Sequence, residues 1–372
     1  MAALRGIRVR KASLVGATLL ALGMLASSAQ AAENAKAGAN QAAVPLDAAC
    51  KGKPGKVDSA GFVRIGGIEQ WVTAKGDSCA NPVILFISGG PGNPLSPLSD
   101  TMYGAWSKDF IVVQWDQRGA GMTYGRNPPA EGETLTIERM AKDGNELAEY
   151  LAHRYGKRKV ILWGSSWGSI LGVYMAKARP DLFYAYVGTS QVVNSLENQA
   201  ESYKKLMALA EAANDQPSLA VLKQVGTPPW TDPRSFGKVR RVIRAYEAKV
   251  TTPPPSTWKP APEYTTPKAT EDYTNGEDYS FINFVGMHGD GMLAHANLPA
   301  LGTDFAIPVF LIEGKQDLLA TPDVARRWYD QIKAPEKGWV LLEHAGHDPN
   351  QDVIDAEYKV LRERVLPLTR EK

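Results

Sequence analysis

VILWGSSWG, residues 160–168, joins a run of four apolar residues to a Gly-x-Ser-x-Gly pattern centred on Ser166. The apolar run predicts a buried strand, and the residues that follow predict a helix ending near Arg179. A sharp turn between a strand and a helix needs glycine where the backbone is crowded, and it lifts the serine hydroxyl above the sheet. We therefore predict Ser166 as a nucleophile, with the amide of Trp167 at the helix N-terminus as an oxyanion donor.

Strands and helices alternate on both sides of this stretch. The predicted strands lie at 62–75 (a hairpin around Gly66-Gly67), 83–87, 110–115, 183–187, 308–312 and 339–342, and the predicted helices at 136–155, from 322 onward with Thr321 as cap, and 352–364. Apolar runs without alternation suit strands that are covered on both faces. The pattern predicts an α/β fold with a mostly parallel central sheet flanked by helices.

The alternation stops in the middle of the chain, and this divides the sequence into four parts. We expect a signal peptide at 1–31, the first part of the core at 32–188, an inserted and mainly helical cap at 189–305, and the second part of the core at 306–372. A helical stretch at 194–213 opens the cap. Six prolines within residues 252–267 predict a stiff loop across the cap.

The N-terminus is typical of a secretory signal. Four basic residues precede an apolar run at 12–26, and small residues at 29 and 31 suit cleavage after Ala31. An apolar run of roughly 15 residues is shorter than the ~20 that span a bilayer, so we expect no stable membrane anchor once the signal is removed. The predicted location is the periplasm or the outside of the cell.

The charge balance excludes some classes of partner. The signal holds four cations and no acid, so 38 Lys and Arg remain against 40 Asp and Glu, and the mature net charge is near −2. This balance provides no excess of positive charge that would bind nucleic acid or an anionic membrane surface. We expect a small peptide or another small molecule as the partner, and the sequence leaves the oligomeric state open.

Cys50 and Cys79 are the only two cysteines in the chain. In an oxidising compartment they are expected to form a disulfide, which would stabilise the fold by roughly 3 kcal/mol. A metal pair is disfavoured, because no third ligand clusters near them.

A serine nucleophile needs a base within hydrogen-bond reach and an acid that orients this base. Only His344 and His347 follow the last predicted strand, and we predict His347 as the base because the preceding glycine lets its loop turn back over the sheet. Asp317 is the predicted acid, because it follows a late strand at the edge where ligands bind in open α/β sheets. Asp323 fits better as a charge in a first helical turn, and Asp348 lies very close to the base in sequence.

A second oxyanion donor is expected from the loop Ser88-Gly89-Gly90-Pro91-Gly92, which follows the strand at 83–87. Glycines let backbone N–H groups approach a ligand closely. We therefore predict Gly89 or Gly90 as the donor.

Together these motifs resemble the prolyl iminopeptidase branch of the α/β-hydrolase superfamily. The matching elements are Gly-Gly-Pro-Gly at 89–92, Trp-Asp-Gln-Arg-Gly-Ala-Gly at 115–121, the turn at 164–168, and the loops of Asp317 and His347. The resemblance covers residues 60–188 and 306–365. It implies hydrolysis by Ser166 that releases an N-terminal residue through an acyl-enzyme, with Asp116 and Arg118 as structural support. Ser88 stands where the family usually has histidine.

The substrate is less well defined by the sequence. Glu197 and Glu201 share one helix face, where they either bind a substrate ammonium group or form a solvated surface. An esterase, lactonase or amidase with the same Ser-Asp-His residues is the alternative, and a binding protein without catalysis is a third hypothesis. We expect no cofactor and no metal, because no ligand spacing or phosphate loop occurs.

Overall fold

The computed structural model describes Cys50 and residues 55–370 of the 372-residue chain. The predicted signal at 1–31 lies outside the described residues. Within the described part, no helix has both the length and the apolar character needed to cross a membrane.

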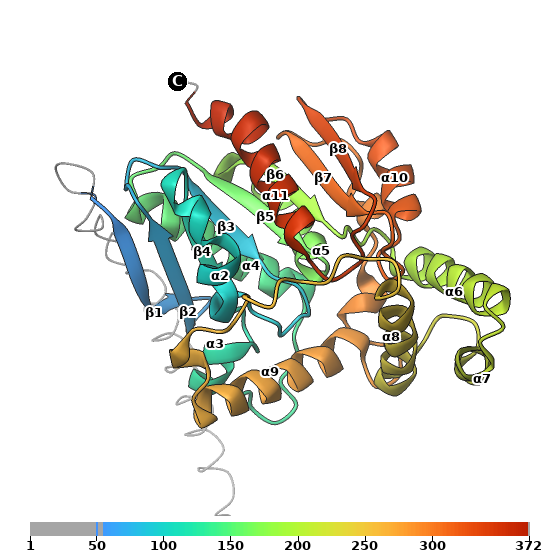
Figure 1. Cartoon of the computed structure of the whole chain (residues 1–372). Coiled ribbons are helices and arrows are strands. Elements are labelled where there is room, and N and C mark those ends of the chain that lie inside the picture. The colour runs from blue at the N-terminus through green and yellow to red at the C-terminus, as the bar shows by residue number, and fades with distance from the viewer. Residues whose placement is uncertain (1–49, 51–54, 371–372) are drawn as a thin grey trace, which may run out of the picture. The chain divides into compact units, whose positions relative to one another are not determined.

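One eight-stranded sheet forms the centre of the fold (Figure 1). Its strands are β1 (Val57–Ile65), β2 (Ile68–Gly76), β3 (Val83–Ile87), β4 (Ile111–Trp115), β5 (Val160–Ser165), β6 (Phe183–Thr189), β7 (Val309–Gly314) and β8 (Lys337–Leu342). Their order is β1-β2-β4-β3-β5-β6-β7-β8, with β1 and β2 antiparallel to their neighbours and the remaining pairs parallel. The predicted mostly parallel sheet is confirmed, and so is the hairpin, whose turn uses the positive φ angles of Gly66 and Gly67.

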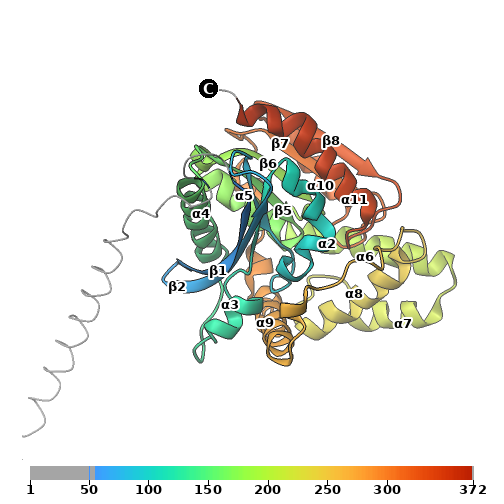
Figure 2. The same cartoon turned by 60° about the vertical axis from the view of Figure 1, so that its left-hand side comes forward.

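Helices cover both faces of the sheet, which explains why the central strands are apolar along their whole length. The helices are α2 (Ser99–Tyr103), α3 (Gly121–Arg126), α4 (Ile137–Arg154), α5 (Trp167–Ala178), α10 (Pro322–Gln331) and α11 (Gln351–Val360). Val83 and Leu85 pack in one buried cluster with α4, α5 and α10, whereas Ile84 and Phe86 pack in the other with α2 and α11. Figure 2 shows α4 on one side of the strands and α2 and α11 on the other. The fold is thus that of an α/β hydrolase.

Four helices lie between β6 and β7, and we name them the inserted helices: α6 (Ser195–Ala212), α7 (Gln216–Val225), α8 (Pro233–Glu247) and α9 (Pro267–Val285). In Figure 1 they gather at one end of the sheet. Each begins at a capping side chain that accepts a bond from the amide three residues later: Asn194, Asp215, Asp232 and Thr266. Polar caps of this kind are the local signal that starts each helix.

The proline-rich segment at 252–267 connects α8 to α9 and runs along the core, not across the inserted helices as predicted. The Thr252 amide donates to the His344 carbonyl at 2.9 Å, and the Ala261 amide donates to the Pro97 carbonyl at 2.9 Å. The indole of Trp71, on β2, donates to the Tyr264 hydroxyl at 3.0 Å. The prolines stiffen the segment, and these contacts hold it against the sheet and its loops.

Two helix ends differ from the prediction. Thr321 makes no capping bond with its side chain, and its hydroxyl is buried without a partner among the described residues, so Pro322 alone marks the start of α10. The final helix ends at Val360, and one π-helical turn, Leu361–Val365, continues it.

Cys50 and Cys79 form a disulfide with their Cα atoms 5.3 Å apart, as predicted. The bond joins the beginning of the described chain to the loop between β2 and β3.

Candidate active site

Ser166 lies at a tight turn between β5 and α5, with φ +53° and ψ −118°. A Cβ atom on Gly164 would lie 2.3 Å from the Gly168 carbonyl oxygen, and one on Gly168 would lie 1.9 Å from the Ile87 carbonyl oxygen. Both positions therefore require glycine. A non-glycine residue at positive φ is strained, and it persists only where the surroundings hold it in place. The Ser166 amide donates to the Thr189 carbonyl at 3.1 Å, which ties the turn to β6.

Three side chains predicted from the sequence come together at this turn. The hydroxyl of Ser166 and Nε2 of His347 are 2.9 Å apart, and Nδ1 of His347 lies 2.9 Å from Oδ2 of Asp317. Asp317 follows β7 and His347 follows β8, so two loops at the carboxyl edge of the sheet supply the acid and the base. This order of contacts assigns the Nδ1 proton to the bond with Asp317 and leaves Nε2 as the acceptor for the serine proton.

The environment of His347 raises the pKa of its imidazole. The second oxygen of Asp317, Oδ1, accepts bonds from the amides of Leu319 and Ala320 at 2.8 and 2.7 Å, so both oxygens of this buried carboxylate have donors. Burial alone would lower the pKa of His347, but the charge and hydrogen bond of Asp317 outweigh burial, and the pKa is raised overall. The ring can accordingly take up a proton from the serine.

The predicted oxyanion donors lie beside the serine. A Cβ on Gly89 would lie 3.3 Å from the Cβ of Ser166, so the backbone of this loop approaches the serine closely. Gly90 lines a cavity to which Ser166 also belongs. In the part of the chain that the structure describes, the amides of Gly89, Gly90 and Trp167 have no acceptor. They can donate to an oxygen that develops negative charge next to Ser166.

Gln117 connects the two sides of this donor site, and the sequence reasoning passed over it. Its Oε1 accepts from the indole of Trp167 at 3.0 Å, and its Nε2 donates to the Ser88 carbonyl at 3.1 Å. The glutamine is 2% exposed, so both bonds are shielded from water. The family resemblance implies structural support by Asp116 and Arg118, whereas the side-chain amide of Gln117 between them makes the contact with Trp167.

Asp116 and Arg118 lie further from Ser166. Asp116 is buried and accepts from the Ser96 hydroxyl and from the Met122 amide; burial raises its pKa to about 7, although these two bonds lower it. Arg118 donates to Asp143 on α4 and to the Gly66 carbonyl in the hairpin, each at 2.9 Å. Both residues hold loops and helices together.

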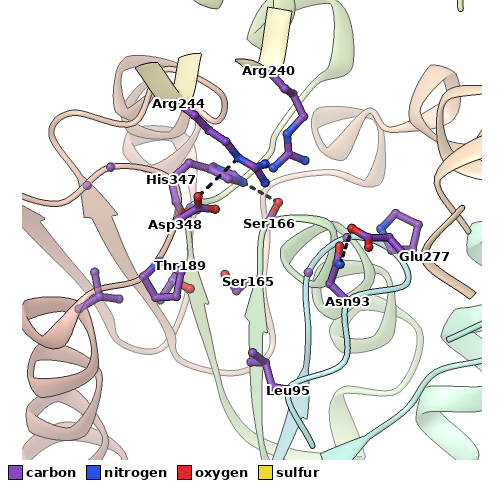
Figure 3. Close-up of a pocket in the computed structure, with 18 of the residues that line it drawn as sticks. Asn93, Leu95, Ser165, Ser166, Thr189, Arg240, Arg244, Glu277, His347 and Asp348 are labelled. Carbon is purple, nitrogen blue, oxygen red and sulfur yellow. Dashed lines mark hydrogen bonds and ion pairs between the residues drawn. The ribbon is translucent and has the colours of Figure 1, made fainter. Parts of the chain in front are cut away.

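A cavity of about 480 Å³ opens above Ser166 (Figure 3). Core loops and two of the inserted helices line it: α8 contributes Arg240 and Arg244, and α9 contributes Glu277. A smaller pocket of about 40 Å³ adjoins Ser166, with mostly apolar walls. Its apolar lining consists of Val192, Trp230, Phe236, Phe284, Leu293 and Leu319.

Other candidates from the sequence lie outside this arrangement. Glu197 and Glu201 line neither cavity, and the carboxylate of Glu197 pairs with Arg327 at 2.7 Å. Glu197 therefore faces α10 at the surface, and Glu201 lies outside both cavities. His344 is exposed, and Asp323 pairs with Lys205. Asp348 lines the large cavity, where it lies 3.7 Å from Arg244.

Glu247, at the end of α8, is a buried carboxylate that the sequence reasoning missed. Its Oε1 accepts from the Leu318 amide at 2.7 Å and its Oε2 accepts from the His347 amide at 3.2 Å. Burial and the nearby charge of Asp317 raise the pKa of Glu247 to about 7, against the opposing effect of His347 and the two amides. One side chain of an inserted helix thus holds the loops of both the acid and the base.

Comparisons with known proteins agree with this arrangement. The family model of serine aminopeptidases S33 matches residues 98–353. The probable aminopeptidase YbaC of Bacillus subtilis is 29% identical over 289 residues, which cover 77% of this chain and 89% of that protein. The proline iminopeptidase of Lactobacillus helveticus is 23% identical over 313 residues, covering 80% and 94%.

The crystal structure of a proline iminopeptidase from Mycobacterium smegmatis has the same fold, with a TM-score of 0.60 at 18% identity over 84% of this chain and 99% of that one. The family model spans more than half of the sequence, from α2 to α11. The chain therefore belongs to the S33 family of serine aminopeptidases, a group of α/β hydrolases.

Proposed function

We propose that the protein is an exported serine aminopeptidase of the prolyl iminopeptidase type. The observation that carries the proposal is the continuous chain of contacts from Ser166 through His347 to Asp317, with both links at 2.9 Å. The strained backbone of Ser166 supports it, because strain of this kind clusters at catalytic positions.

In the proposed reaction, the Ser166 hydroxyl attacks the carbonyl carbon of the substrate's first peptide bond while His347 Nε2 accepts its proton. The amides of Trp167 and of Gly89 or Gly90 stabilise the resulting oxyanion. His347 then passes the proton to the departing amine, and the C–N bond breaks. Water, deprotonated by His347, hydrolyses the acyl-enzyme and restores the serine hydroxyl. Asp317 keeps the imidazole oriented and stabilises its positive charge.

The free amine of the substrate needs a negative partner in the cavity. Glu277 lines the cavity from α9, and its carboxylate accepts a hydrogen bond from the side-chain amide of Asn93 at 2.8 Å, which holds the carboxylate in place. Figure 3 shows Glu277 beside Asn93, to one side of Ser166. We assign the ammonium contact to Glu277 in place of Glu197 and Glu201. The mostly apolar pocket next to Ser166 then suits the side chain of the N-terminal residue.

Initial rates on three chromogenic substrates test the proposal: prolyl-anilide, its N-acetylated form and a short-chain nitrophenyl ester. We expect turnover of the free-amine anilide only, lost in Ser166→Ala and in His347→Ala. His344→Ala is the matched control, because this exposed histidine belongs to the same loop as the base. Ester turnover without anilide turnover would replace the aminopeptidase by an esterase with the same residues, and activity in Ser166→Ala would overturn the nucleophile.

Export through a signal at 1–31 is part of the same proposal, as is the division into a core at 32–188 and 306–372 and a cap at 189–305. The disulfide between Cys50 and Cys79 supports export, because disulfides persist in oxidising compartments. Mass spectrometry of the protein purified from producing cells tests it. A mature chain that begins at Ala32 is the expected result, and a chain that retains the basic N-terminus would contradict cleavage.

A further inference from the structure

Arg240 is a cation in the wall of the cavity above Ser166. It lines both the large cavity and the smaller pocket, and its guanidinium makes no hydrogen bond or ion pair with any residue that the structure describes. Burial and the neighbouring Arg244 lower the pKa of Arg240, against the opposing effect of the carboxylates of Asp348, Glu247 and Asp317. The guanidinium carries five donors, and because Arg240 lines the cavity, a ligand that supplies acceptors can reach them.

A second cation lies one helical turn further along the same face of α8. Arg244 also lines the cavity, and its contact with the exposed Asp348 is long, at 3.7 Å between Nε and Oδ2. Figure 3 shows both guanidinium groups pointing down from α8 toward Ser166 and His347. Two of the acids that line the cavity, Glu277 and Asp278, come from α9, whereas Asp348 lies beside Arg244. Figure 3 shows the two arginines on one side of Ser166 and Glu277 on another.

We propose that Arg240, assisted by Arg244, binds the C-terminal carboxylate of a short peptide, so that the preferred substrates are zwitterionic dipeptides. This inference rests on the aminopeptidase function proposed above. The planar guanidinium matches a carboxylate through two parallel N–H···O bonds, which fix the position of the ligand. A dipeptide places its ammonium group and its carboxylate on opposite sides of a single peptide bond, as Glu277 and Arg240 lie on different sides of the serine.

Peptide pairs that differ only in the terminal group provide the test. We expect kcat/KM for prolyl-alanine to exceed that for prolyl-alanine amide by about 10- to 100-fold, the usual worth of a hydrogen-bonded charge pair. Arg240→Gln is expected to remove this preference, so that kcat/KM becomes equal for the acid and the amide. Arg240→Lys keeps the charge but not the fork, and should retain part of the preference. Arg234→Gln is the matched control, because Arg234 is an exposed arginine of α8 outside the cavity.

A carboxylate can also be carried by the side chain of the N-terminal residue, and aspartyl-alanine amide distinguishes this source. If this amide is cleaved faster than prolyl-alanine amide, and the advantage is lost in Arg240→Gln, the carboxylate site is supported and the dipeptide preference is overturned. Equal rates on prolyl-alanine and its amide in the parent protein, or a preference that survives in Arg240→Gln, would overturn the role of Arg240.

Binding measured without turnover separates this inference from the proposed function. Calorimetry of prolyl-alanine with Ser166→Ala should show affinity that falls about 10- to 100-fold when Arg240→Gln is added. Arginine-dependent binding in a protein that hydrolyses no peptide would support the carboxylate site and refute the aminopeptidase. Turnover of prolyl-anilide without preference for a free carboxylate would refute the site and leave the aminopeptidase standing.

Discussion

Replacement of Glu247 by glutamine should move the pH dependence of catalysis. His347 must be unprotonated to accept the serine proton, so kcat/KM rises with pH through the pKa of this histidine. Ionised Glu247 is one of the charges that raise the pKa of His347. Because the pKa of Glu247 is itself about 7, its charge develops over the same pH range, and the two groups titrate together.

In Glu247→Gln this negative charge is absent, so the acidic limb of the kcat/KM profile should shift to lower pH by up to about one unit. Initial rates on prolyl-anilide between pH 5 and 9 measure the shift. Glu343→Gln is the control, because this exposed carboxylate pairs with Lys315 near the same edge of the sheet. An acidic limb that stays in place, or that moves to higher pH, would refute the electrostatic link between Glu247 and the base.

The same substitution has a cost in stability that can be derived from the contacts. The carboxylate serves two amides, those of Leu318 and His347, and glutamine offers only one acceptor oxygen. One buried amide loses its partner, which costs roughly 1 to 3 kcal/mol in the free energy of unfolding. The pKa of Glu247 is raised on folding, from 4.5 to about 7, so its contribution to stability is complete below pH 4.5 and lost as the pH rises through 7. Denaturant titrations should show a weaker loss of stability between pH 5 and 8 in Glu247→Gln.

Two further perturbations test other parts of the structure. Gln117→Leu breaks the connection between Trp167 and the Ser88 loop, and should lower kcat on prolyl-anilide by roughly tenfold or more because the oxyanion donors lose alignment; an unchanged kcat in a folded variant would contradict this positioning role. The double variant Cys50→Ser/Cys79→Ser should lose about 3 to 4 kcal/mol of unfolding free energy with kcat unaffected, because the unfolded chain gains entropy when the loop between the two cysteines is no longer closed. Equal denaturation midpoints in both proteins would refute this expectation.

Local chemistry explains why much of the fold could be predicted from the sequence. Apolar runs such as 83–87 and 160–163 are strands whose two faces are both covered, so each run is apolar without alternation and can be recognised in the sequence. The turn at Ser166 was predictable because the crowding around it excludes every side chain at Gly164 and Gly168. The places of Asp317 and His347 followed from the strands before them, since the carboxyl ends of parallel strands meet at one edge.

The inserted helices could not be placed in the same way. Two glutamates four residues apart predict a shared face for Glu197 and Glu201, but the pattern says nothing about which neighbour that face meets, and the structure brings it to Arg327. Glu247 contacts loops that lie 71 and 100 residues away in the chain, and Arg240 lines a cavity together with His347. Such contacts depend on how α8 packs over the sheet, and no local spacing encodes that packing.

Helix α8 has two roles, and this limits how the protein can evolve. Arg240 and Glu247 are seven residues apart, two turns along one face, so the helix that lines the cavity also holds the loops of the acid and the base. Replacement of this insert by one without a carboxylate at position 247 would change the cavity wall and remove both bonds to the loops of the acid and the base. Single substitutions within α8 that leave its last turn intact would change the cavity wall alone.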